Sequence, residues 1–256
     1  MAIAYRSKTE IEGIRRAGRV VMEVLAVLRD AVRPGVTTGE LSALAERELK
    51  ARGATSNFKG YRPERGVPPF PAVLCASVDD EVLHGIPGRR VLREGEIVAL
   101  DMGAVVDGWH GDSAITVPVG QVSADTQRLL DITQEALRRG IAAARPGARV
   151  LDISRAIQTY VEGQGCSIVR HYGGHGIGRA LHEDPFVPNY IERGQANPLL
   201  RPGMVMCVEP MVNAGALATH ELPDRWTVVT ADGSRSAHFE HTIAITHGNP
   251  DILTAS

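Results

Sequence analysis

Residues 92–101 read LREGEIVALD, and residues 200–209 read LRPGMVMCVE. Both segments begin with Leu-Arg-x-Gly, continue as an apolar, strand-like run and end in an acid, Asp101 or Glu209. A carboxylate is rarely buried unless it is paired or binds a metal ion. The two segments therefore predict two equivalent buried strands, each of which brings one acid into the interior.

A second acid stands at the head of an apolar strand in each half of the chain. Residues 111–115 read GDSAI and contain Asp112, whereas residues 239–243 read FEHTI and contain Glu240. If a pseudo-twofold axis relates the halves, all four carboxylates meet at one central point. The alternative is that Arg-Pro-Gly is common turn chemistry and that the match is chance.

Each strand-rich block follows a pair of helix-like segments. The first pair starts at two capping boxes, Ser7 to Glu10 and Thr37 to Glu40, and is broken at Pro34-Gly35. The second pair is broken at Pro146-Gly147, 112 residues further along. We therefore predict a duplicated α+β fold in which residues 1–256 form one catalytic domain, with halves of roughly 1–120 and 121–256.

Composition excludes several classes of protein. A formal charge of -2 and a pI near 6.5 give no basic excess for a nucleic-acid or membrane-surface partner. No apolar run approaches a membrane span, and the first residues lack the layout of a signal peptide. Cys75, Cys166 and Cys207 form no C-x-x-C pair, so we expect a cytoplasmic protein with free thiols. A monomer is the simplest expectation for the oligomeric state.

A single histidine joins the four acids as a predicted ligand. His175 lies in Gly-Gly-His-Gly-Ile-Gly, where neighbours without side chains allow close approach of both backbone and substrate. A set of hard carboxylate oxygens with one imidazole suits two divalent ions of the Mn, Fe, Co, Ni or Zn type. Two such ions polarise a water and so favour hydrolysis. The predicted metal ligands are Asp101, Asp112, His175, Glu209 and Glu240.

The other histidines carry weaker signals. His182, in Leu-His-Glu-Asp-Pro, and His84, in Leu-His-Gly-Ile-Pro, are candidates for catalysis or for ordinary turns. The rest are interpreted as structural or solvated by default, although His110 and His241 flank predicted ligands and are candidates for hydrogen-bond donors to them.

Taken together and in order, these motifs resemble one known family, type I methionine aminopeptidase, which has the pita-bread fold. The resemblance covers nearly the whole chain. The motifs that carry it are His84-Gly-Ile-Pro, Asp101-x10-Asp112, His110-Gly-Asp, Gly-His175-Gly-Ile-Gly, His182-Glu-Asp-Pro, Glu209-Pro-Met-Val-Asn, Trp226-Thr-Val and Glu240-His-Thr.

The resemblance implies a role for each matching residue. Asp112 and Glu240 would bridge two metal ions, Asp101 would complete one of them, and His175 with Glu209 the other. Glu209 would also act as the general base, His182 would stabilise the tetrahedral oxyanion, and His84 would contact the substrate backbone. The substrates implied are the N-terminal methionyl peptides of nascent chains, with a small second residue.

The family position of five residues suggests the pocket for the methionine side chain, which should be apolar. Core packing is the ordinary alternative for such residues. The candidates are Phe58, Phe70, Cys75, Leu181 and Trp226.

Three features depart from the family pattern. Leu181 replaces a frequent aromatic residue, which leaves the shape of the pocket open. The acidic segment at 79–81 leaves open whether a monovalent ion binds near Asp79. The Pro-rich loop at 61–71 is extended and locally basic, with Lys59, Arg62 and Arg65 nearby; it is either a transient contact for the ribosome or a solvated loop.

Other functions compete with this interpretation. A proline-specific peptidase of the same fold would share all five ligands, but it usually carries an extra N-terminal domain. An inactive protein that only binds the ribosome or RNA would not need the full ligand set. A type II enzyme is disfavoured because Glu209 and Glu240 are only 31 positions apart.

Finally, His175 has no counterpart in the first half, so the two metal sites should be unequal, with the His175 site the tighter.

Overall fold

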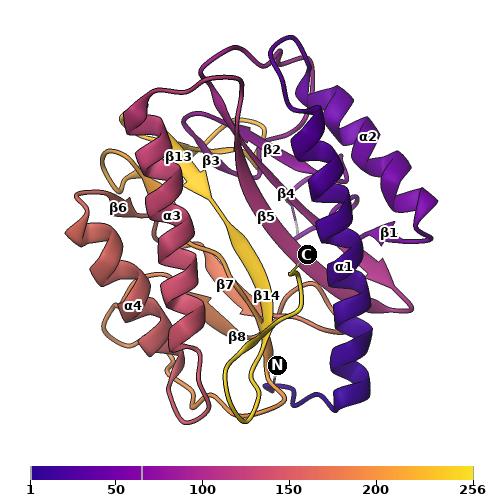
Figure 1. The fold of residues 1–256 in the computed structure, drawn as a ribbon, viewed down its shortest axis with the longest axis vertical. Coiled ribbons are helices and arrows are strands. Elements are labelled where there is room, and N and C mark those ends of the chain that lie inside the picture. Colours follow the sequence, from indigo (N-terminus) through magenta and orange to yellow (C-terminus); the bar gives the residue numbers. More distant parts are fainter. Residues whose placement is uncertain (1, 65, 256) are drawn as a thin grey trace.

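The computed structural model describes residues 2–64 and 66–255. Two pairs of helices cover one face of a large antiparallel sheet (Figure 1). The helices are α1 (Lys8–Ala31), α2 (Thr38–Ala51), α3 (Ala124–Ala143) and α4 (Val150–Gly163). The strands are β1 (Thr55–Ser56), β2 (Cys75–Val78), β3 (Glu81–Leu83), β4 (Ile97–Val106), β5 (Trp109–Pro118), β6 (Ser167–Ile168), β7 (Gly173–Gly176), β8 (Glu183–Pro188), β9 (Val205–Val208), β10 (Met211–Asn213), β11 (Thr219–Glu221), β12 (Val228–Thr230), β13 (Ser236–His238), β14 (Glu240–Ala244) and β15 (Asp251–Ile252).

The helix starts follow the predicted capping chemistry. Ser7 and Thr37 each accept a hydrogen bond from the backbone of the glutamate three residues later, and that glutamate bonds back. Both predicted capping boxes are therefore confirmed. The sequence interpretation missed the cap of α3, where Ser123 accepts from the Thr126 backbone.

The Pro-Gly breaks have the same structure in both halves. Gly35 donates to the Leu92 carbonyl over 2.9 Å, and Gly147 donates to the Leu200 carbonyl over 3.0 Å. Both glycines have a positive φ, 91° and 87°, which a side chain would oppose. The equivalence of the two Leu-Arg-x-Gly segments is thus matched by equal hydrogen bonds to the helix pairs.

The sheet is symmetric about its middle. Among the described residues the strand order is β1-β4-β5-β14-β9-β7-β8, with β2 also beside β4 and β15 beside β14. The two halves meet where β5 pairs with β14. One sheet therefore joins both halves of the chain, as the prediction of a single α+β domain requires.

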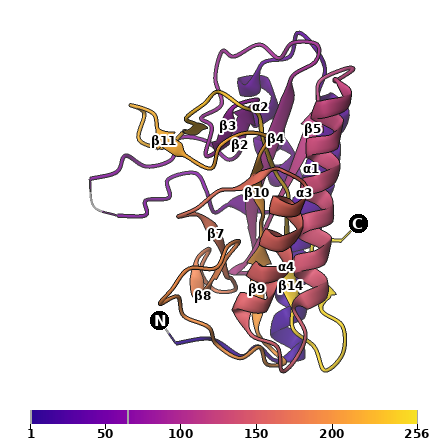
Figure 2. The same cartoon turned by 90° about the vertical axis from the view of Figure 1, so that its left-hand side faces the viewer.

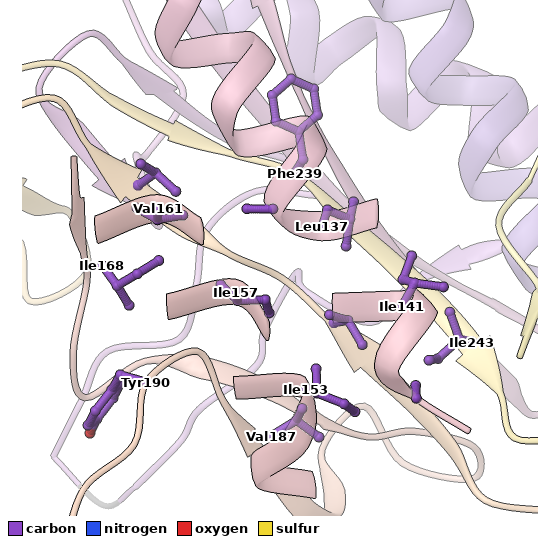
Figure 3. Packing of buried hydrophobic residues seen from close by; sticks show 14 of the residues in the cluster. Leu137, Ile141, Ile153, Ile157, Val161, Ile168, Val187, Tyr190, Phe239 and Ile243 are labelled. Carbon is purple, nitrogen blue, oxygen red and sulfur yellow. The ribbon is translucent and has the colours of Figure 1, made fainter. Parts of the chain in front are cut away.

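Helix packing determines which face of the sheet is available for chemistry. In the second half, Ile157 of α4 and Leu137 of α3 pack in one cluster with Phe239 and Ile243 (Figure 3). Side chains alternate between the two faces of a strand. Because Phe239 faces the helices, its neighbour Glu240 points to the opposite face. The turned view shows that face covered by loops and by β7 and β8 rather than by helices (Figure 2).

Candidate active site

The strand register places the four acids on the same face of the sheet. Gly103 pairs with Asp112, and Asp101 lies two residues earlier on the same strand. Ala114, two residues after Asp112, pairs with Glu240. Directly paired residues and residues two apart share a face, so these three acids lie together.

Glu209 joins them through the next pair of strands. Thr242 of β14 pairs with Cys207 of β9, and Glu209 follows Cys207 by two residues. The four acids that the repeat related in pairs are therefore brought together across the centre of the sheet.

A cavity of about 400 Å³ opens over this face. All of the residues predicted for the site line it. They are Phe58, Phe70, Cys75, His84, Asp101, Asp112, His175, Leu181, His182, Glu209, Trp226 and Glu240.

Three of the four acids keep one buried oxygen that forms no hydrogen bond with the described residues. Among the described residues, Asp101 Oδ1, Asp112 Oδ1 and Glu240 Oε1 are buried without a hydrogen-bond partner. His175 Nε2 lies 3.8 Å from Asp112 Oδ2 and 3.7 Å from Glu209 Oε1, both too long for hydrogen bonds. Carboxylate oxygens without hydrogen bonds, at these distances from an imidazole nitrogen, form a donor set suited to cations.

The tautomer of His175 agrees with a ligand. Its Nδ1 lies 3.0 Å from the Gly176 carbonyl, and a carbonyl can only accept, so Nδ1 carries the proton. Nε2 is then left with a lone pair directed at the acids. Burial lowers the pKa of His175 to about 3, which keeps the ring neutral and able to bind a metal.

Burial also opposes ionisation of the acids. It raises the pKa of Asp101 to about 7 and, together with the charge of Asp101, the pKa of Glu209 to about 8. The pKa values of Asp112 and Glu240 are raised well above their usual range, first by burial and then by neighbouring carboxylates. Four acids in this arrangement need a cation to ionise together.

An apolar pocket adjoins the acids. Cys75 pairs with Asp101 across β2 and β4 and forms part of its wall. The ring of Phe70 packs against Trp226, with centroids 5.1 Å apart, and against Phe58 at 6.4 Å. His84 lies at the junction, 5.8 Å from the Trp226 ring. The wall is therefore aromatic on one side and opens to the acids on the other.

Several residues of the site were not predicted. Tyr61, Tyr172 and Phe186 also line the cavity, and no spacing in the sequence singles them out. Cys207 was read only as a strand residue, yet it offers its sulfur within 4.8 Å of ligand atoms of Asp112, His175 and Glu240. Cys207 lies two residues before Glu209, so strand alternation could have predicted that both side chains point to the same face of the sheet.

Three further histidines lie close to the predicted ligands. His238, interpreted as structural or solvated, is buried with Nε2 3.7 Å from Glu209 Oε2. His110 and His241 form side-chain hydrogen bonds through Nδ1 with Asn57 and Thr254. Hydrogen bonds from these two histidines to the ligands stay a prediction.

The departures from the family pattern occupy the edge of the site. Asp79 has φ of 54° and accepts hydrogen bonds from the Ile97 backbone and the Arg235 guanidinium, each over 3.0 Å. Arg235 thus compensates the charge of Asp79. Lys59 pairs with Glu46 at 2.6 Å, whereas Arg65 lies outside the described residues.

Known proteins similar to this chain share its whole length. Methionine aminopeptidase 1 of Bacillus subtilis is 50% identical over 252 residues, covering 98% of this chain and 99% of the relative. The methionine aminopeptidase of Aquifex aeolicus is 48% identical and covers 99% of both chains. The solved methionine aminopeptidase of Thermotoga maritima superposes with a TM-score of 0.94 at 41% identity, covering 100% of both.

More distant structures share the fold alone. The prolidase of Pyrococcus furiosus superposes with a TM-score of 0.78 at 21% identity, covering 98% of this chain but 65% of its own. No helix in the described part of the chain is long and apolar enough to cross a membrane.

The match to Metallopeptidase family M24 spans residues 12–247. With this match and with relatives up to half identical over nearly its full length, the chain belongs to metallopeptidase family M24.

Proposed function

We propose that this protein is a metal-dependent aminopeptidase that removes the initiator methionine from nascent chains and prefers a small second residue. The observation that carries the proposal is the meeting, in one cavity, of four buried acids and His175 with an aromatic pocket. Relatives of about half identity that are named methionine aminopeptidases support it.

Two divalent ions fit the donors present. We assign Asp112 and Glu240 as bridging ligands, Asp101 as a further ligand of one ion, and His175 with Glu209 as ligands of the other. The unpartnered buried oxygens and the free Nε2 of His175 support this assignment. The ions are Co, Mn, Fe, Zn or Ni in kind, since this donor set accepts each. When bound, such ions supply an activated water at neutral pH and stabilise negative charge.

The residues around the donors then divide the remaining work. The pocket of Phe58, Phe70, Cys75, Leu181 and Trp226 holds the methionine side chain. Glu209 takes up the proton that leaves the attacking water, as a carboxylate that the bound cations keep ionised. His182 donates a hydrogen bond to the developing oxyanion, and His84 contacts the substrate backbone.

A peptide assay tests this function directly. Chelated enzyme is reloaded with one metal at a time and offered Met-Ala-Ser, Met-Leu-Ser and an Ala-Pro dipeptide. We expect metal-dependent release of methionine, faster from Met-Ala-Ser than from Met-Leu-Ser. Faster cleavage of Ala-Pro would instead support a proline-specific peptidase, and no cleavage of any peptide would support an inactive binding protein.

Titration of the chelated enzyme with metal tests the inequality of the two sites. His175 adds a neutral nitrogen donor to one site only, and we expect that site to fill first. Two indistinguishable binding steps would contradict the assignment.

We further infer a monomer that works in the cytoplasm and touches the ribosome transiently through the loop at 61–71. The three buried free thiols are consistent with a reducing compartment. Sedimentation velocity measures the oligomeric state. Co-pelleting with ribosomes, with and without the loop shortened, measures the contact.

A further inference from the structure

Tyr61 reaches the centre of the site through His182. Its hydroxyl oxygen lies 2.6 Å from His182 Nδ1, and the two rings are 5.1 Å apart. His182 also meets His175, with ring centroids 4.3 Å apart in an edge arrangement. A single chain of contacts therefore runs from Tyr61 through His182 to a predicted metal ligand.

The backbone holds Tyr61 in this place. Gly60 donates to the Phe70 carbonyl over 2.8 Å, and Phe70 donates to the Tyr61 carbonyl over 2.9 Å, so these bonds close the neck of the long loop. The loop itself projects from the molecule beyond this neck (Figure 2).

Two side chains from another part of the chain tie the loop down. Arg225 Nη1 donates to the Gly66 carbonyl over 3.0 Å, and Trp226 Nε1 donates to the Pro68 carbonyl over 3.1 Å. Because Trp226 also forms the aromatic wall, the neck and the pocket are parts of one rigid arrangement.

The chemistry of the two groups decides what the contact does. A neutral imidazole has one nitrogen that donates and one that accepts. A phenol can donate, and partial burial raises the pKa of Tyr61, so it stays protonated. When Tyr61 donates to Nδ1 of His182, the proton of the ring is confined to Nε2, the nitrogen that is free to donate.

We propose that Tyr61 is a positioning residue that donates to His182 Nδ1 and so holds His182 in the tautomer whose Nε2–H faces the reacting carbonyl. The inference rests on the proposed role of His182 as the oxyanion donor. The neck of the loop then orients a catalytic group in addition to lining the cavity.

Tyr61→Phe removes the hydroxyl and keeps the ring. We expect kcat for Met-Ala-Ser to fall about three- to tenfold, the worth of one ordinary hydrogen bond, with KM and metal content unchanged. Tyr160→Phe, which removes a hydroxyl from α4 far from the cavity, is the matched control and should leave kcat unchanged. In a His182→Ala background, Tyr61→Phe should cost nothing further; an equal loss there would overturn the proposal.

Nitrogen-15 NMR of the zinc-loaded enzyme tests the tautomer without any assay of activity. The His182 signals, assigned by their loss in His182→Ala, should show a protonated Nε2 in the wild type and a mixture of tautomers in Tyr61→Phe. An unchanged tautomer in Tyr61→Phe would overturn the proposal. Full activity of His182→Ala would overturn instead the role of His182, and wild-type enzyme without methionine release would overturn the proposed function itself.

Discussion

Asp112 and Glu240 are buried side by side in the sheet, 4% and 2% exposed. Each has one carboxylate oxygen without a partner among the described residues. Burial raises the pKa of both acids, and neighbouring carboxylates raise it further: Asp101 and Glu209 act on Asp112, and Asp112 acts on Glu240. A buried acid without a partner costs free energy unless a cation offsets it. These two residues therefore form the part of the site that depends most on metal.

Replacing either acid with its amide should separate metal binding from folding. For Asp112→Asn or Glu240→Gln we expect loss of bound metal and a fall in turnover of at least about a hundredfold. The metal-free fold should remain intact, because the amide removes charge repulsion and keeps the shape of the side chain. Metal analysis with circular dichroism measures both; Asp131→Asn, on the exposed face of α3, is the control. Wild-type turnover by either variant would contradict the site.

His182 should affect rate without affecting metal. It lines the cavity and contacts His175 through its ring, but its Nδ1 is occupied by Tyr61. For His182→Ala we expect kcat to fall about a hundredfold or more, as for loss of one oxyanion donor, with metal content kept. A parallel fall in metal content would make His182 a ligand instead.

At the scale of elements, β7 positions His175 between two other strands. Gly174, which precedes His175, approaches the Cys207 carbonyl of β9 so closely that an added Cβ would collide with it. The same Cβ would lie 3.2 Å from Val187 of β8. The glycines around His175 therefore allow the close approach of backbone that the sequence suggested, here between neighbouring strands.

Gly174→Ala should therefore weaken the metal site at His175, although Gly174 is not itself a predicted ligand. The clash with backbone has no easy relief, and we expect a loss of about 1–3 kcal/mol in the free energy of unfolding, with weaker metal binding at His175. Gly163→Ala is the matched control, since nothing lies within 4 Å of a Cβ at the end of α4. Chemical denaturation and metal titration measure the two effects. Equal stability of both variants would show that β7 adapts to the side chain.

Much of the secondary structure was predictable because its causes are local. The capping boxes at Ser7 and Thr37 and the Pro-Gly breaks act within a few residues of themselves. The acids were recognisable because a charge within an apolar run is rare. The contact between Tyr61 and His182 was not predictable, because 121 residues separate them and a flexible-looking loop carries one of them.

The stability of the whole molecule should depend on pH because the acids are buried. The folded, metal-free protein keeps protons on Asp101 and Glu209, with pKa values of about 7 and 8, that the unfolded chain has lost above pH ~4.5. The stability contributed by these two groups therefore falls as pH rises above ~4.5 and is lost once pH has passed their folded pKa values of about 7 and 8. Buried His84 and His175, with pKa values of about 4 and 3, act in the opposite sense. Their contribution is complete above pH ~6.5 and is lost only below it.

We therefore expect the melting temperature of the chelated protein to fall between pH 6.5 and 8.5. The loss should be about 1.4 kcal/mol per pH unit for each proton released. The metal-loaded protein should not show this fall, because bound cations stabilise the ionised acids, and its metal affinity should rise with pH. Calorimetry measures both forms, and Glu209→Gln should reduce the slope. A chelated protein equally stable at both pH values would refute the explanation.

The helix pairs, their breaks, the two equivalent acid-tipped strands and the family could all be read from the chain, because each leaves a pattern over neighbouring residues. The pairing of β5 with β14, which brings four acids from two halves to one face, was only suggested by the repeat. Family position suggested the residues of the aromatic wall, but the packing of its rings and the contact of Tyr61 with His182 belong to the tertiary structure alone. They depend on packing between segments far apart in the chain, and no local preference encodes which distant side chains will meet.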